Sequence, residues 1–561
     1  MVLSKEKNLE LDIRKFSLAN AYLHEGKAQA GAVLGKILND RPHLKLHIYA
    51  VMPLINKTIK DIEKLNVPEQ ETELREIYND FFDKPVVREK TLPEIQNTVR
   101  GKVITRFAPS PSGPLHIGHI YVMNLNAEYA KKYGGKFILR IEDTNPENIQ
   151  IDAYKMIPED AKWATNNRVS KVIVQSSRMN KYYKWAKELL TREHAYVCFC
   201  SPNKWQKLVA EGVGCPERNV NGKTQLKFWK EMLSGKIKQG QAIVRLKTNM
   251  SDKNPAMRDF AILRINNSVH PKVGRKYRVW PLMNLAVAVD DHELGITHSI
   301  RGKDHRDNAK KQEIIQKYLG WNIPVALFVG RINFKDFNVS TTETRKAIQK
   351  KKYSGWNDVR LPFLRALKRR GYKSQALAKF VIEMGINEND KTVSLEEFFE
   401  NLNSYNRAII DKSADRYWFI PEPVKIFVRN APKIKNVKAK LHPDKDATRL
   451  INVTKTLYIP KNDLEKYKNI EVRLMHLYNV NLKTNADFTS EENKNVQKIQ
   501  WLPSNNIRTE VLMPNGKIVK GLGELHLKKL KLGKTIQFER FGFVTLDKKE
   551  TNKLTFAFLH A

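Results

Sequence analysis

The sequence predicts a multidomain protein of mixed α/β and all-β class, with a parallel-sheet core between N-terminal helices and C-terminal β-barrels. At about 150 residues per domain, 561 residues predict three to five domains. Strand-like and helix-like segments alternate over residues 103–190 and again over 294–319, which is typical of a doubly wound parallel sheet. After Asp415, short β-branched runs lie between Pro, Asn and Gly turns, which favours one or two small barrels.

The composition points to a polyanionic partner. The chain has 99 Lys and Arg against 60 Asp and Glu, a net charge of +39, so nucleic acid is the leading partner. Three cysteines do not make a disulfide framework, and 41% hydrophobic residues argue against disorder throughout. The N-terminus is charged, and no apolar run approaches the ~18 residues of a membrane helix. We expect a soluble, cytoplasmic protein without a membrane partner.

The elements follow in order along the chain. Residues 1 to about 98 are predicted to be helical, including a helix from Leu54 to about Leu65 with apolar residues at helical spacing. A strand at 103–107, a Pro- and Gly-rich loop and a helix from Ile117 come next. They are followed by strands at 137–141 and 171–175 and helices at 152–163 and 179–190. Residues 196–280 are predicted to be loops and a compact cysteine-bearing segment. A strand at 294–300, a helix at 304–319 and helical structure over about 361–410 precede the barrels.

The densest chemical signal is the segment 105–119, where the first strand hands over to a helix. Free backbone N–H groups and the dipole of a helix N-terminus favour phosphate there. His116 and His119 can donate hydrogen bonds to a triphosphate, and Gly118 leaves room for a nucleotide base. The Gly-rich patterns of other nucleotide sites are absent from the sequence. Taken alone, the segment could also be a turn with two surface histidines.

These residues resemble class I aminoacyl-tRNA synthetases, whose HIGH signature matches residues 116–119. The preceding residues 106–113 narrow the resemblance to glutamyl-tRNA synthetase of the archaeal type. Glutaminyl-tRNA synthetase typically has Glu and Asn where this chain has Ser110 and Ser112. The resemblance continues, in family order, at 140–146, 287–292, 295–305, 354–361, 367–371 and 537–543.

The resemblance implies a domain order. A helical N-terminal extension spans 1–98, and a Rossmann-type catalytic core is split into halves at 99–194 and 286–335. An acceptor-end-binding insertion occupies 195–285. A KMSKS-like loop and helical connecting domain follow at 336–412, and anticodon-binding β-barrels at 413–561.

The resemblance also implies a substrate site. It places Arg106 and Arg301 on the carboxylates of glutamate, Ala108 and Ser110 beside the substrate, and Glu142 on its α-ammonium group. Guanidinium forks and one fixed anion suit a ligand with two carboxylates and one ammonium. Glu142 and Arg301 each follow a predicted strand, at the edge where α/β sheets bind ligands.

ATP is expected at His116, Gly118 and His119, together with Ser340 and Thr341 of the family's second signature, which should lie at 339–343. Threonine and glutamate, at Thr341 to Glu343, stand where the family keeps a lysine that neutralises the triphosphate. Arg345 and Lys346 are the candidates that take over its catalytic role.

A second departure lies in the glutamate pocket. Met283 aligns with a tyrosine that the family uses against the glutamate side chain, and a thioether cannot donate a hydrogen bond.

The resemblance implies a glutamate–tRNA ligase that uses ATP with Mg²⁺ and L-glutamate and charges tRNA(Glu), with tRNA(Gln) left open as a second substrate. The alternatives are a glutaminyl-tRNA synthetase and a catalytically impaired tRNA-binding paralogue. Basic runs at 350–352, 368–370 and 528–531 are solvated faces or parts of an RNA path.

Zinc at Cys198, Cys200 and Cys215 is left open but not favoured, because a tetrahedral site needs a fourth ligand. His194 and Glu217 are the candidates for it. Buried free thiols are the preferred interpretation of the three cysteines.

Overall fold

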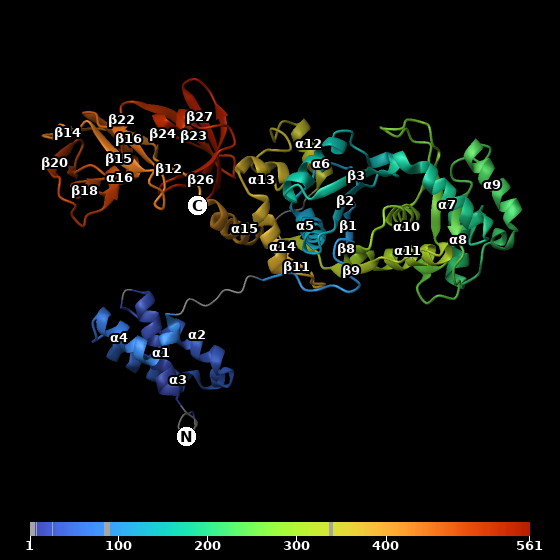
Figure 1. The fold of residues 1–561 in the computed structure, drawn as a ribbon, viewed down its shortest axis with the longest axis horizontal. Helices are drawn as coiled ribbons and strands as arrows, with labels where there is room; N and C mark the ends of the chain where they lie inside the picture. The colour runs from blue at the N-terminus through green and yellow to red at the C-terminus, as the bar shows by residue number, and fades with distance from the viewer. Residues whose placement is uncertain (1–5, 7, 25, 83–89, 336–339) are drawn as a thin grey trace. The chain divides into compact units, whose positions relative to one another are not determined.

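A computed structural model describes residues 6, 8–24, 26–82, 90–335 and 340–561. The chain divides into two compact units, one within residues 1–90 and one from Thr91 to Ala561 (Figure 1). Among the described residues, no helix combines the length and apolarity that crossing a bilayer requires.

The first unit is a small helical bundle. Its helices are α1 (Leu9–Leu23), α2 (Ala30–Asp40), α3 (Ile48–Ile62) and α4 (Val67–Ile77). They pack around Ile13, Val33, Ile37 and Ile55, which are almost fully buried. Helix α4 begins at a capping box, in which the side chain of Asn66 accepts the N–H of Glu69 and the Glu69 carboxylate accepts the N–H of Asn66. The helix predicted from Leu54 is the second half of α3.

The second unit begins with a parallel sheet in two halves. Strands β1 (Ile104–Phe107), β2 (Lys136–Ile141) and β3 (Val169–Val174) pair in parallel, as do β8 (His298–Gly302) and β9 (Val325–Val329). The halves meet where the N–H of Thr297 donates to the carbonyl of Ile104 at 3.0 Å, which brings β8 beside β1. The interrupted parallel sheet expected from the sequence is therefore present. The strand expected at 294–300 begins only at His298, because Gly295 turns the chain with φ of 65°.

In the described part of this unit, five α-helices pack against this sheet or connect its strands. They are α5 (Ile117–Lys132), α6 (Ala153–Ala164), α7 (Met179–Thr191), α10 (Met283–Glu293) and α11 (Arg306–Leu319). The turn from α5 into β2 requires glycine at Gly135, since a Cβ atom there would lie 1.9 Å from the carbonyl oxygen of Val103. Helix α5 begins at the signature histidines, which therefore lie near the C-terminal end of β1.

The region between the halves is more regular than the sequence pattern indicates. Its strands β4 (Ala195–Cys198), β5 (Ile243–Leu246), β6 (Ala261–Ile265) and β7 (Val279–Pro281) form one antiparallel sheet. Helices α8 (Pro202–Glu211) and α9 (Gly222–Ser234) lie between β4 and β5 in the chain. The expectation of mostly loops was wrong, because strands of three to five residues are too short to reveal an alternation.

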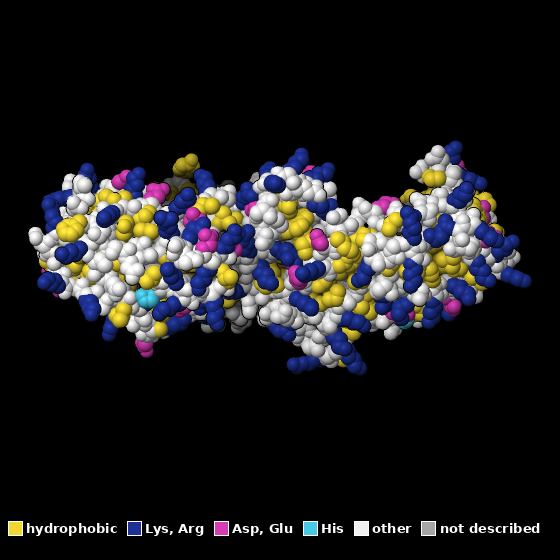
Figure 2. All heavy atoms as spheres, turned by 90° about the horizontal axis from the view of Figure 1, so that it is seen from above, with side chains coloured by type: hydrophobic (Ala, Val, Ile, Leu, Met, Phe, Trp, Pro, Cys, Tyr) yellow, Lys and Arg dark blue, Asp and Glu magenta, His cyan; other side chains and the backbone are white. Residues whose placement is uncertain are grey.

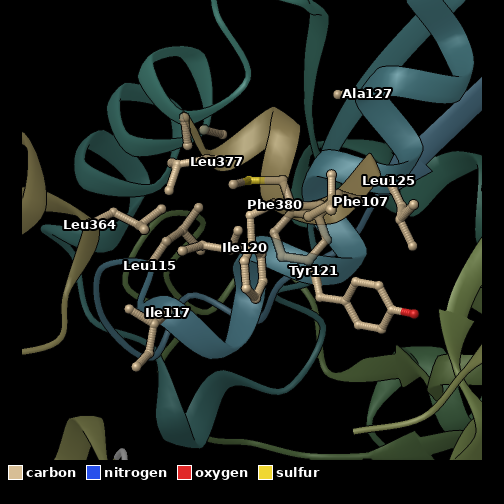
Figure 3. Close-up of a cluster of buried hydrophobic side chains, with 14 of the residues drawn as sticks. Phe107, Leu115, Ile117, Ile120, Tyr121, Leu125, Ala127, Leu364, Leu377 and Phe380 are labelled. Carbon is tan, nitrogen blue, oxygen red and sulfur yellow. The ribbon is translucent and has the colours of Figure 1, made fainter. Parts of the chain in front are cut away.

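The connecting region is helical, with one exception. It holds α12 (Thr341–Gln349), α13 (Leu364–Arg370), α14 (Ser374–Met384) and α15 (Leu395–Ile410). Strand β11 (Lys391–Val393) interrupts the expected helical run and pairs in parallel with β10 (Ile332–Phe334). Figure 3 shows the core that joins this region to α5, where Leu364, Leu377 and Phe380 lie against side chains of α5 and the loop before it.

The C-terminal region holds two curled sheets and a hairpin. Their strands are β12 (Arg416–Tyr417), β13 (Phe419–Pro421), β14 (Pro423–Arg429), β15 (Asn436–Lys440), β16 (Thr448–Asn452), β17 (Thr456–Pro460), β18 (Glu471–Leu474), β19 (Asn479–Leu482), β20 (Ala486–Ser490), β21 (Lys498–Ile499), β22 (Leu502–Pro503), β23 (Asn506–Leu512), β24 (Ile518–Glu524), β25 (Thr535–Phe538), β26 (Gly542–Lys549) and β27 (Lys553–His560). One seven-stranded sheet has the order β12-β25-β26-β27-β23-β24-β13, with β12 and β13 at its edges. The other has the order β21-β18-β19-β20-β14-β17-β22, with β21 and β22 at its edges. In each, the two edge strands are neighbours in the chain, so the sheet must curl until its edges approach, as in the expected barrels.

Candidate active site

A cavity of about 220 Å³ lies where β1, β2 and β8 end. Strands of a parallel sheet present their carboxyl ends at one edge, and ligands bind there. The cavity is lined by Arg106, Phe107, Ala108, Gly118, His119, Val122, Arg140, Glu142, Met283, Val287, Ile300, Arg301, Gly302, His305 and Gln312. Side chains from three strand ends and three helices thus converge on one site.

A buried ionic network forms the floor of this cavity. The guanidinium of Arg140, which is fully buried, donates to Asp291 at 2.5 Å and to Glu142 at 3.1 Å. Arg106 reaches the same Asp291 carboxylate at 3.3 and 3.4 Å. Burial opposes ionisation of Asp291, but Arg106 and Arg140 more than offset it and lower the pKa of the carboxyl. The network holds both guanidinium groups and Glu142 in place before any ligand arrives.

Arg301 is a different kind of cation. Among the described residues, its guanidinium donates only to the hydroxyl of Ser299, at 3.1 and 3.3 Å. Within the described part of the chain, no carboxylate lies within 4 Å of it. Burial and then the neighbouring charge of Arg106 lower the pKa of Arg301 to about 9. A desolvated guanidinium that lacks its own carboxylate is suited to receive one from a ligand.

The two signature histidines are neutral hydrogen-bond donors. The Nδ1 of His116 accepts the N–H of Gly118 at 3.1 Å, and the Nδ1 of His119 accepts the N–H of His116 at 3.2 Å. Each ring therefore carries its proton on Nε2. Burial lowers the pKa of His116 to about 4, and burial together with His116 lowers that of His119 well below its usual range. The rings, with centroids 3.8 Å apart, stay uncharged at neutral pH.

The structure gathers most, but not all, of the predicted substrate residues. Of these, Arg106, Ala108, Gly118, His119, Glu142 and Arg301 line the cavity, and His116 packs on His119. Ser110 is exposed and does not line the cavity. Sequence reasoning assigned no role to Arg140 or Asp291. A charged residue inside an apolar strand, or directly after an apolar run within a helix, was the signal that could have found them.

The comparisons with known proteins agree with this geometry. The model of tRNA synthetases class I (E and Q), catalytic domain, matches residues 102–406, and models of the family's anti-codon binding domain match residues 414–501 and 490–547. A glutamate--tRNA ligase of Pyrococcus abyssi is 41% identical over 97% of this chain and 98% of its own length. The chain belongs to the class I synthetase family for glutamate and glutamine. A glutamate--tRNA ligase of Methanocaldococcus jannaschii is 39% identical over 98% of this chain and all of its own.

One solved relative has a more distant likeness. A glutamate tRNA ligase from Elizabethkingia meningosepticum is 20% identical, with a TM-score of 0.38 over 56% of this chain and 70% of that one. Family membership of this synthetase therefore rests on the sequence matches.

The segment in which the sequence predicts the second signature lies beside the first signature. Val339 falls outside the described residues. Ser340 caps α12 by accepting the N–H of Glu343 at 3.2 Å. A Cβ atom on Gly113 would lie 3.3 Å from the Thr341 side chain, so α12 begins against the signature loop. Arg345 donates to the carbonyl oxygen of Ser112 in the same loop, whereas Lys346 and Glu343 are exposed.

The three cysteines of the synthetase form one cluster with Glu217. The Sγ of Cys215 lies 3.3 Å from that of Cys198 and 3.4 Å from that of Cys200, and a carboxylate oxygen of Glu217 is 2.5 Å from it. Four donor atoms thus lie within 4.8 Å of one another. The other fourth-ligand candidate, His194, stacks on Tyr318 with ring centroids 4.3 Å apart. Of the two candidates for a fourth donor, the structure places Glu217 beside the three thiols.

Positive charge is unevenly distributed along the synthetase. Residues 195–285 carry 17 Lys and Arg against 5 Asp and Glu, whereas residues 1–90 carry 15 against 14. On the face drawn in Figure 2, Lys and Arg side chains are widely spread and acidic ones are fewer. The lysines of the runs at 350–352 and 528–531 are exposed and remain candidates for an RNA path.

The third basic run has a structural role instead. Arg369 forms a two-pronged ion pair with Asp547 at 2.8 and 2.7 Å, and Arg370 donates to the carbonyls of Phe558 and Leu559. These two arginines join α13 to the last curled sheet.

Proposed function

We propose that this protein is a glutamate–tRNA ligase that activates L-glutamate with ATP and transfers it to the 3′ end of tRNA(Glu). The observation that carries the proposal is Arg301, a partly buried cation without a carboxylate partner among the described residues, facing a cavity that also holds Glu142 and His119. Guanidinium groups of Arg106 and Arg301 match the two carboxylates of glutamate, and Glu142 matches its ammonium group. The relatives that are about 40% identical over nearly the whole chain support the same reaction.

The proposed reaction has two steps. A carboxylate oxygen of glutamate attacks the α-phosphorus of ATP, and pyrophosphate leaves as the adenylate forms. A hydroxyl of the terminal tRNA ribose then attacks the glutamyl carbonyl, and AMP leaves. Mg²⁺ accompanies the ATP phosphates. The side chains act by aligning the reactants, and the Nε2–H groups of His116 and His119 stabilise the charge that develops on phosphate.

Two alternatives make different predictions. A glutaminyl-tRNA synthetase would need a neutral amide partner, whereas Arg301 is a cation that favours a carboxylate. A silent tRNA-binding paralogue is motivated by Thr341, Glu343 and Met283, but such a protein does not need an ionic network around an amino-acid pocket. Measuring adenylate formation and aminoacylation with pure glutamate and glutamine, each with tRNA(Glu) and tRNA(Gln), separates the three. Glutamine preferred over glutamate, or no turnover at all, would overturn the proposal.

The segment at 340–343, where the family's lysine is missing, predicts a substitution that raises activity. We expect Glu343→Lys to raise the rate of glutamate activation, because it removes a negative charge near the triphosphate and adds a positive one. Arg345→Ala and Lys346→Ala should lower that rate if these residues replace the missing lysine. Gln349→Lys, at the far end of α12, is the control for a general effect of charge. An active wild type that is indifferent to all three changes would place the loop outside the reaction path.

We also propose that the cysteine cluster binds zinc structurally. The thiol spacings of 3.3 and 3.4 Å approach the ~3.8 Å expected between ligands of a tetrahedral Zn–S site, and Glu217 completes four donors. Because three of the donors are thiols and no open position remains, the role would be to hold β4 to the segment at 215–217.

The zinc content tests this second proposal. The purified protein should contain one zinc per chain, and Glu217→Gln should weaken zinc affinity at least ~10-fold and lower the unfolding temperature. His194→Ala should leave the zinc content unchanged, since His194 stacks on Tyr318. A wild-type protein that binds no zinc from a buffered supply would leave only the buried thiols expected from the sequence.

A further inference from the structure

The signature segment is bonded directly to the start of α13. The N–H of Ile117 donates to the carbonyl of Pro362 at 3.0 Å, and the N–H of Leu364 donates to the carbonyl of Leu115 at 2.9 Å. Figure 3 shows Leu115 and Ile117 beside Leu364 in the core. The residue between them, His116, is therefore held by a short antiparallel bridge to Phe363 as well as by its own helix.

A buried carboxylate completes this attachment. Asp160 on α6 is only 4% exposed, and its Oδ2 accepts the N–H of Leu115 at 3.1 Å. Its Oδ1 lies 3.2 Å from the Nε of Arg365 on α13. The Asp160 carboxylate thus contacts the signature segment through Oδ2 and helix α13 through Oδ1. Asp160 lies outside the substrate cavity and has no part in the reaction described above.

We propose that Asp160 is a positioning residue, whose ionised carboxylate fixes the signature segment against Arg365 so that His116 and His119 face the phosphates of ATP. The proposal rests on the proposed function, because it concerns the adenylate-forming step. An ionised carboxylate accepts the Leu115 N–H more strongly than a protonated carboxylic acid does. Only the ionised form of Asp160 makes an ion pair with Arg365. Protonation would loosen both contacts at once.

The surroundings of Asp160 make this protonation accessible near neutral pH. Arg365 and Lys368 face it from α13, Glu159 from its own helix, and the Leu115 N–H from the signature segment. Burial raises the pKa of Asp160 to about 7, although Arg365 opposes the rise. His116, with a pKa of about 4, and His119 do not titrate in that range. We therefore expect protonation of Asp160 to be the cause of a loss of activity between pH 8 and pH 6.

The test is the pH profile of adenylate formation, measured on full-length protein with tRNA present and saturating substrates. For the wild type we expect kcat to fall about tenfold as the pH drops through 7, with the KM for ATP and glutamate changing little. Asp160→Asn should have a low kcat, about tenfold below the wild type at pH 8, and should lack this acid limb. Arg365→Gln removes the cation that opposes protonation, so its limb should move to higher pH.

Thermal unfolding distinguishes positioning from a purely structural role. Because the folded-state pKa lies above the usual value for aspartate, the stability that Asp160 contributes is lost as pH rises through 7. Relative to the wild type, Asp160→Asn should therefore become more stable as pH rises, while its activity deficit grows. A structural role alone would make stability and activity change together.

Glu159→Gln is the matched control, since Glu159 also pairs with Arg365 but is exposed and does not reach Leu115. It should retain the wild-type rate at pH 8 and keep an acid limb, which should move only to lower pH because the charge of Glu159 raises the pKa of Asp160. An acid limb that survives in Asp160→Asn, or that stays in place in Arg365→Gln, would overturn the inference. A wild type that makes no glutamyl-adenylate at any pH would instead overturn the proposed function.

Discussion

Replacing His119 by alanine should lower adenylate formation at least ~100-fold while changing tRNA binding little. The Nε2–H of His119 is aimed into the cavity by the bond between its Nδ1 and the N–H of His116, so alanine removes a prepared donor to developing charge. Because burial keeps the ring neutral, the loss should be the same from pH 6 to pH 8. Single-turnover formation of the adenylate and a separate tRNA-binding titration measure the two quantities.

Two further variants separate the donor from the helix cap. His119→Asn keeps an acceptor for the N–H of His116 but loses the distal donor, so it should be stable and inactive. His119→Gln can place an amide N–H near the former Nε2 and should recover part of the rate. His292→Ala, at a ring stacked on Trp321 and outside the cavity, should match the wild type. If His119→Asn were as active as the wild type, the histidine would serve the helix start rather than ATP.

Replacing Arg301 by glutamine should raise the KM for glutamate at least ~100-fold and leave that for ATP nearly unchanged. Losing a two-pronged bond between guanidinium and carboxylate removes two charge-assisted hydrogen bonds, each worth about 1.5–3 kcal/mol. The folded protein should not become less stable, because Arg301 has only the Ser299 hydroxyl as partner in the part of the chain that the structure describes and is repelled by Arg106. Initial rates at varied glutamate and a thermal melt measure these effects.

The charge of Arg301 also gives a prediction about pH. Burial and the charge of Arg106 lower the pKa of Arg301, but a guanidinium stays charged in proteins across the pH range of an assay. Between pH 7 and pH 9 the wild-type KM for glutamate should therefore change no more than the KM of Arg301→Gln does. Arg306→Gln, at an exposed arginine paired with Glu388 on the surface, is the control that should keep the wild-type profile. A glutamate KM that is unchanged in Arg301→Gln would exclude this arginine from the carboxylate site.

Much of the fold could be predicted from local pattern. The parallel strands near 104 and 137, the helices that follow them and the change to β structure after Asp415 are present at or near their predicted positions. Periodicity and turn residues carry this information within a few neighbours. The sheet at 195–281 escaped prediction because its strands are short, and β11 escaped because its pairing partner β10 lies about 60 residues earlier.

The sequence by itself determined the order of the parts and the residues offered at each strand end, since side-chain spacing and strand direction are local properties. Only the tertiary structure decided which distant residues became partners. Packing brings Asp291 into contact with Arg106 and Arg140. It places Glu217, rather than His194, beside the three thiols. It pairs Arg369 with Asp547. It also left Arg301 without a carboxylate among the described residues and enclosed Asp160 beneath the signature segment. The reason is physical: the charge state and use of a buried ionisable group depend on groups that packing brings within a few ångströms, and local sequence does not encode those neighbours.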